Sequence, residues 1–60
     1  MSRVLVVEGS RTQAQQIKLL LEDASFEVEL ARHGLEAMAA MRRAVPDIVL
    51  HTPYALEALR

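Results

Sequence analysis

The segment "RVLVVEGS", residues 3–10, decides the fold of this chain. Its four consecutive apolar residues, Val4–Val7, are typical of a strand that is covered on both faces in a parallel sheet. A polar turn follows, and Ser10 with Gln13 three residues later forms a capping-box pattern at a helix start. The segment therefore predicts a buried strand leading into a helix, the place where α/β proteins put their functional residues.

The next part of the chain predicts a helix and a second strand. Apolar residues at helical spacing continue from Ser10 to Asp23, and Ser25 is expected in the turn that ends this helix. Over residues 26–30, apolar residues alternate with Glu27 and Glu29, which predicts a half-exposed edge strand with both acids on a solvated face.

The alternation of strand and helix then repeats. After a break at His33 and Gly34, a second helix is expected, and Pro46 stops it. Residues 48–50 predict a third strand, and residues 54–60 a short third helix. The order β-α-β-α-β-α with right-handed crossovers gives one α/β domain over residues 1–60, with parallel strands in the order 2-1-3.

Composition narrows the range of functions. The chain has 60 residues, a formal net charge of −1 and no cysteine, which excludes disulfides and thiolate metal ligands. There is no basic stripe for nucleic acid, and the four-residue apolar run is too short for a signal peptide or a membrane span. We therefore expect a cytoplasmic protein without nucleic-acid or membrane partners, built on an aliphatic core.

The third strand raises a question about partners. Ile48, Val49 and Leu50 have the composition of a buried strand, yet no fourth strand follows to cover the outer edge. An apolar edge with free backbone groups seeks a partner. The sequence therefore predicts an association through this strand.

Residues 3–50 resemble the first half of a response-regulator receiver domain. The resemblance rests on the first strand with its acidic turn, on "LLLEDASFEVELARHGLEAMAAM" and on "PDIVL". It implies half of a flavodoxin-like fold, which has five strands and five helices when complete. The family function is phosphotransfer from a histidine kinase to an aspartate, supported by Mg²⁺ on clustered acids.

The sequence departs from the receiver pattern at its functional positions. Glu8 matches the first metal-binding acid, but Gly9 stands where the second is expected. The phosphoacceptor position falls on Thr52, and an alternative alignment that matches Pro53 to the family's proline supplies no aspartate either. Strands 4 and 5, with their lysine and Ser/Thr, are missing. We therefore expect no enzyme activity, no metal and no cofactor.

Two further site hypotheses come from the residues themselves. Glu8, His33 and His51 are expected on one rim of the sheet and could form a metal site, although solvated loop histidines are the simpler interpretation. The exposed face of the first helix could dock onto a kinase, since in the family this helix lies against the histidine-bearing helices. Its polar residues are Arg11, Gln15, Gln16 and Lys18.

The leading functional hypothesis is a truncated, phosphorylation-incompetent receiver-like module that forms a homodimer. Two third strands would pair antiparallel about a two-fold axis and give a six-stranded sheet. Tyr54, Leu56 and Leu59 would pack across the junction. The alternatives are a decoy or adaptor that binds a histidine kinase or a full receiver, a residual phosphotransfer site at Glu8, His51 and Thr52, and an engineered or degenerate half-domain without activity.

Overall fold

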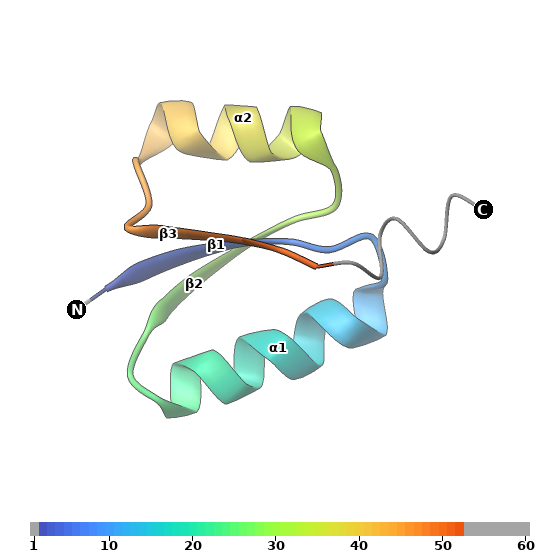
Figure 1. Cartoon of the computed structure of the whole chain (residues 1–60), viewed down its shortest axis with the longest axis vertical. Helices are drawn as coiled ribbons and strands as arrows, with labels where there is room; N and C mark the ends of the chain where they lie inside the picture. The colour runs from blue at the N-terminus through green and yellow to red at the C-terminus, as the bar shows by residue number, and fades with distance from the viewer. Residues whose placement is uncertain (1, 53–60) are drawn as a thin grey trace.

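The computed structural model describes residues 2–52. Figure 1 shows the chain as a sheet with one helix on each face. The elements in chain order are β1 (Arg3–Val7), α1 (Arg11–Asp23), β2 (Glu27–Ala31), α2 (Gly34–Arg43) and β3 (Ile48–His51). The helix predicted over residues 54–60 lies outside the described residues, and with it the interface residues Tyr54, Leu56 and Leu59.

The sheet has the predicted topology. Its three strands are parallel in the order β2-β1-β3, so β1 is central. Val4 is level with Val28 on one side and with Ile48 on the other. Figure 1 shows α1 and α2 on opposite faces of this sheet. The arrangement is half of a flavodoxin-like fold, as the sequence predicts.

Local hydrogen bonds fix both ends of α1, from a side chain at its start and from the backbone at its end. The Ser10 side chain accepts a hydrogen bond from the N–H of Gln13 at 3.3 Å, which confirms the predicted N-cap. At the other end, the N–H of Ser25 donates to Glu22 O at 3.0 Å and the N–H of Phe26 donates to Leu21 O at 3.0 Å. These two bonds form a Schellman motif, which requires a left-handed residue. Ser25 occupies that position with φ 73°.

The break predicted at His33 and Gly34 is the start of α2. His33 is the N-cap, and its side chain accepts from the N–H of Glu36 at 3.5 Å, while Gly34 is the first helical residue. Arg42 and Arg43 lie in the last turn, where cations complement the helix dipole. The helix begins at Gly34, shortly after β2 ends at Ala31, and it ends before Pro46.

The core is aliphatic, as predicted, and it is centred on β1. Val4–Val7 are all buried. Leu5 and Val7 pack with Ala31 and with the small α2 residues Ala37 and Ala40, against which Met41 is partly buried. The alanines let α2 approach the sheet closely.

The two helices pack over β1 and β2 and leave β3 uncovered. The exposed fractions of Ile48, Val49 and Leu50 are 48%, 50% and 39%. Because side chains alternate between faces, both faces of β3 are exposed as well as its edge. Among the described residues, nothing covers the outer edge of β3, as predicted. The apolar composition of this strand suggests a buried environment, but its side chains are exposed. No helix within residues 2–52 is long and apolar enough to cross a membrane.

Candidate functional site

The carboxyl ends of the three strands meet at one rim of the sheet. Val7 is level with Ala31 of β2 and with His51 of β3. Beyond the strands, the N–H of Glu8 donates to Ala31 O at 2.9 Å, and the N–H of Thr52 donates to Val7 O at 3.3 Å. The backbone therefore brings the two family positions, Glu8 and Thr52, side by side.

Glu8 is the buried polar group of this rim, with an exposed fraction of 1%. One carboxylate oxygen accepts from the N–H of Ser10 at 2.8 Å. The other accepts from the hydroxyl of Thr52. A buried carboxylate needs such donors, because burying it without partners costs several kcal/mol. Glu8 thus joins the start of α1 to the end of β3.

The position after Glu8 carries no acid and has room for one. Gly9 is exposed, and a Cβ at this position would lie 3.7 Å from Arg32 O, an ordinary van der Waals contact. Gly9 has no positive φ that would require glycine. The absence of a second carboxylate is therefore a property of the sequence and not a steric demand of the turn.

The hypothetical metal site is not assembled. His33 caps its own helix, with its Nε2 atom 3.9 Å from Glu36 Oε2, and its side chain is 58% exposed. His51 lies at the exposed end of β3. Residues 2–52 contain no group of three His, Asp or Glu side chains that could hold a metal ion. The three residues share a rim but not a site.

Asp47 lies at the opposite end of β3 from this rim. Its Oδ2 atom accepts from the N–H of Arg3 at 2.7 Å, and its own N–H donates to Arg3 O at 2.9 Å. Asp47 therefore aligns the start of β3 with the start of β1. It takes no part in the chemistry of the rim.

The expectation that Glu27 and Glu29 form a solvated face is wrong for Glu29. Its side chain is only 25% exposed and lies on the α2 side of the sheet, level with Leu5. Arg43 reaches it from α2 at 2.5 Å, and Arg3 from β1 at 3.0 Å. The hydrogen bond from Arg43 and the adjacent charges lower the pKa of Glu29.

A second ion pair stands at the β2–α2 connection. The N–H of Arg32 donates to Glu36 Oε1 at 2.8 Å, and its guanidinium Nη2 lies 2.8 Å from Glu36 Oε2. These hydrogen bonds hold the pKa of Glu36 at about 2. The sequence indicates only a break at His33 and Gly34, because the contact of Arg32 with Glu36 depends on how β2 ends.

Comparison with known proteins gives a local similarity. No family model matches the chain, and no solved structure matches it. A protein-glutamate methylesterase/protein-glutamine glutaminase 3 from Rhodospirillum rubrum is 38% identical over 50 residues. These residues are 82% of this chain and 14% of the relative, so the chain spans about a seventh of that protein's length. This similarity and the half flavodoxin-like fold support a resemblance to the receiver domain, and they do not assign an activity.

Proposed function

We propose that this chain is a receiver-like module of two-component signalling that does not accept phosphate and acts by pairing with a second copy through β3. The receiver resemblance, the sheet order β2-β1-β3 and the similarity to a methylesterase support the signalling context. The observation that carries the proposal is the exposure of β3, whose three apolar residues are 39–50% exposed.

The two outer strands of the sheet differ in a way that favours pairing at β3. β2 carries Glu27, whose side chain is 57% exposed, and charged side chains protect an edge against association. The sequence of β3, Ile48–His51, holds no lysine, arginine or acid. Antiparallel pairing of two β3 strands is self-complementary, as a two-fold axis requires. It would also shield apolar surface on both faces of the sheet.

The rim supports the second half of the proposal, the absence of phosphotransfer. A phosphoryl group needs a metal ion held by clustered oxygen ligands to neutralise its charge. Of the two family positions for metal-binding acids, only Glu8 carries a carboxylate, and it accepts hydrogen bonds from Ser10 and Thr52. Gly9, at the second position, supplies no carboxylate. The hydroxyl of Thr52 donates its hydrogen bond to Glu8.

Sedimentation equilibrium across a dilution series, with circular dichroism at each concentration, tests the pairing. We expect a dimer whose helicity falls on dilution. Val49→Lys puts a charge on the exposed edge strand and should weaken the dimer by at least about tenfold. Val45→Lys is the matched control, because Val45 is 84% exposed and lies outside β3. A folded monomer at micromolar concentration, or equal effects of the two variants, contradicts the proposal.

The absence of phosphotransfer has its own test. The chain is incubated with Mg²⁺ and a small phosphodonor, beside a receiver domain with all its acids as a positive control. We expect no added phosphoryl mass on the chain. A phosphoryl label on Thr52, as an acid-stable ester, or on Glu8, as a labile acyl phosphate, would contradict this part while leaving the pairing intact. A monomer that gains helicity only with a histidine kinase or a full receiver would favour the adaptor instead.

A further inference from the structure

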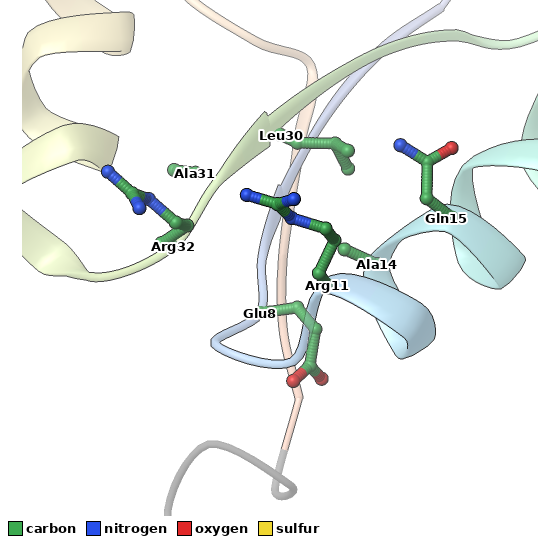
Figure 2. A pocket seen from close by; sticks show the side chains of 7 residues that line it. All are labelled: Glu8, Arg11, Ala14, Gln15, Leu30, Ala31 and Arg32. Atoms are coloured by element: carbon green, nitrogen blue, oxygen red, sulfur yellow. The ribbon is translucent and has the colours of Figure 1, made fainter.

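A cavity of about 330 Å³ lies between the start of α1 and the end of β2 (Figure 2). Its size is at the lower end of the range for small-molecule sites. Seven residues line it: Glu8, Arg11, Ala14, Gln15, Leu30, Ala31 and Arg32. Figure 2 shows the carboxylate of Glu8 turned away from the two arginines, so the stem of this side chain faces the cavity. Glu8 therefore belongs to both places, since its stem lines the cavity and its carboxylate bonds to Thr52 at the rim.

Arg11 gives the cavity a positive charge that is not neutralised. In Figure 2 its side chain extends from α1 toward Leu30 and Ala31 of β2. Four other basic residues of the described part of the chain each pair with a glutamate, namely Arg3, Lys18, Arg32 and Arg43. Within residues 2–52, no carboxylate lies in ion-pair distance of the Arg11 guanidinium. The cavity therefore holds a cation with its donors available.

The rest of the lining is apolar with one amide. Ala14 and Ala31 are buried and Leu30 is half-buried, so they form an apolar floor under the guanidinium. The amide of Gln15 stands on the same helix as Arg11, one turn further along. Arg32 is at the cavity wall, but its guanidinium is hydrogen-bonded to Glu36. Charge and apolar surface are thus combined in one small space.

We propose that this cavity binds a small organic anion, with its head group on Arg11 and its apolar body against Ala14 and Leu30. A guanidinium binds the oxygens of a carboxylate or a phosphate in the same forked geometry, so the two head groups share this chemistry. The Gln15 amide supplies a further donor. The cavity lies beside β2, and the proposed pairing strand is β3 on the other side of β1, so this inference does not depend on the proposed function.

A nuclear magnetic resonance titration of the isotopically labelled full chain tests the proposal. Benzoate and phenyl phosphate are the probes, and benzamide is the uncharged analogue. We expect saturable shifts at the amides of residues 11–15 and 30–32, with millimolar affinity for so small a ligand. Inorganic phosphate alone should bind at least about tenfold more weakly than phenyl phosphate, because it lacks the apolar body. The probe that binds more tightly, benzoate or phenyl phosphate, shows whether the site prefers a carboxylate or a phosphate head group.

Two arginine variants make the test specific. Arg11→Gln should weaken binding of the charged probes by about tenfold or more, since it removes the forked donor. Arg42→Gln is the matched control, because Arg42 is an exposed arginine of α2 and does not line the cavity. Circular dichroism of both variants verifies that they fold. Equal weakening by the two variants, or binding of benzamide as tight as that of benzoate, would overturn the proposal.

Discussion

The hydroxyl of Thr52 donates a hydrogen bond to the buried carboxylate of Glu8. In the receiver resemblance these two positions belong to the first metal-binding acid and to the phosphoacceptor. In this chain they contact each other directly. The bond spans 44 positions of sequence and connects the end of β3 to the turn after β1. At the positions where the family has its reaction centre, this chain has a hydrogen bond that joins β3 to the turn after β1.

The hydrogen bond between Thr52 and Glu8 should be measurable as stability. Thr52→Val removes the hydroxyl at nearly constant volume and leaves Glu8 with the N–H of Ser10 as its remaining donor. We expect a loss of about 1–3 kcal/mol in the free energy of unfolding, because a buried acceptor loses its partner. Urea unfolding measures it. Thr52→Ser keeps the hydroxyl and should recover most of the loss; if it does not, the bond is not the cause.

A pair of acids introduced at the rim should create a divalent-ion site. Gly9→Asp fits, because its Cβ meets Arg32 O at 3.7 Å, and Thr52→Asp places a second new carboxylate beside Glu8. We expect Mg²⁺ to raise the melting temperature of this double variant by mass action and to leave the original chain unaffected. Combining Thr52→Asp with Gly34→Asp is the control, since Gly34 has open space around it at the start of α2. An equal response of both double variants would contradict the assignment.

Ser25 occupies a backbone conformation that favours glycine. Its φ of 73° lies in the left-handed region, where a side chain costs roughly 1–2 kcal/mol. We expect Ser25→Gly to stabilise the chain by about 1 kcal/mol, since the Schellman hydrogen bonds are kept and the strain is removed. Thermal unfolding measures the change. Ser25→Ala keeps the Cβ and should give no gain; a comparable gain in both variants would rule out backbone strain as the reason.

The chain should lose stability in acid, and the pKa of Glu36 sets the pH range in which this happens. Its pKa is about 2 when folded, against an ordinary 4.5, mainly because Arg32 donates hydrogen bonds to it. The pKa of Glu29 is lowered as well, chiefly by Arg43. A carboxyl whose pKa is lowered by folding contributes stability that is complete above its unfolded pKa. We therefore expect stability to decline as the pH falls from about 4.5 toward about 2.

Urea unfolding at a series of pH values verifies this decline. Arg32→Gln should make it shallower, because the guanidinium hydrogen bonds, the largest cause of the low pKa of Glu36, are removed while the bond from the backbone N–H of residue 32 stays. Arg42→Gln, which changes the same charge in the last turn of α2, should leave the slope unchanged. If stability falls with pH at the same slope in the original chain and in both variants, the Arg32–Glu36 pair does not control acid stability.

Local patterns account for most of the fold. The apolar run Val4–Val7 and the cap at Ser10 depend on neighbours in sequence, and the structure confirms both. Helical spacing, in contrast, does not reveal how much of a helix the sheet covers. Leu20 and Leu35 fit their helical patterns but are 73% and 77% exposed, because the sheet under the helices is narrow.

Sequence patterns do not reveal the contacts of the candidate site. Glu8 was identified by position as a family acid, but its burial and its bond to Thr52 arise where two distant strands end together. Likewise, Glu29 looked solvated because it alternates with apolar residues in β2. Its partners Arg3 and Arg43 belong to β1 and α2, so no residue spacing within β2 could predict these contacts.

The difference between the two edges of the sheet, apolar at β3 and charged at β2, bears on how many chains the proposed assembly could hold. If two chains join along β3, the outermost strand on each side of the combined sheet is β2, with Glu27 exposed on it. A third chain then meets carboxylates instead of an apolar strand, and like charges oppose a further β2–β2 contact. In such a dimer, the acid that makes β2 a poor first partner would also stop growth at two copies. A sheet with two exposed apolar edges would invite fibres, whereas pairing through β3 alone would give a closed assembly of two chains.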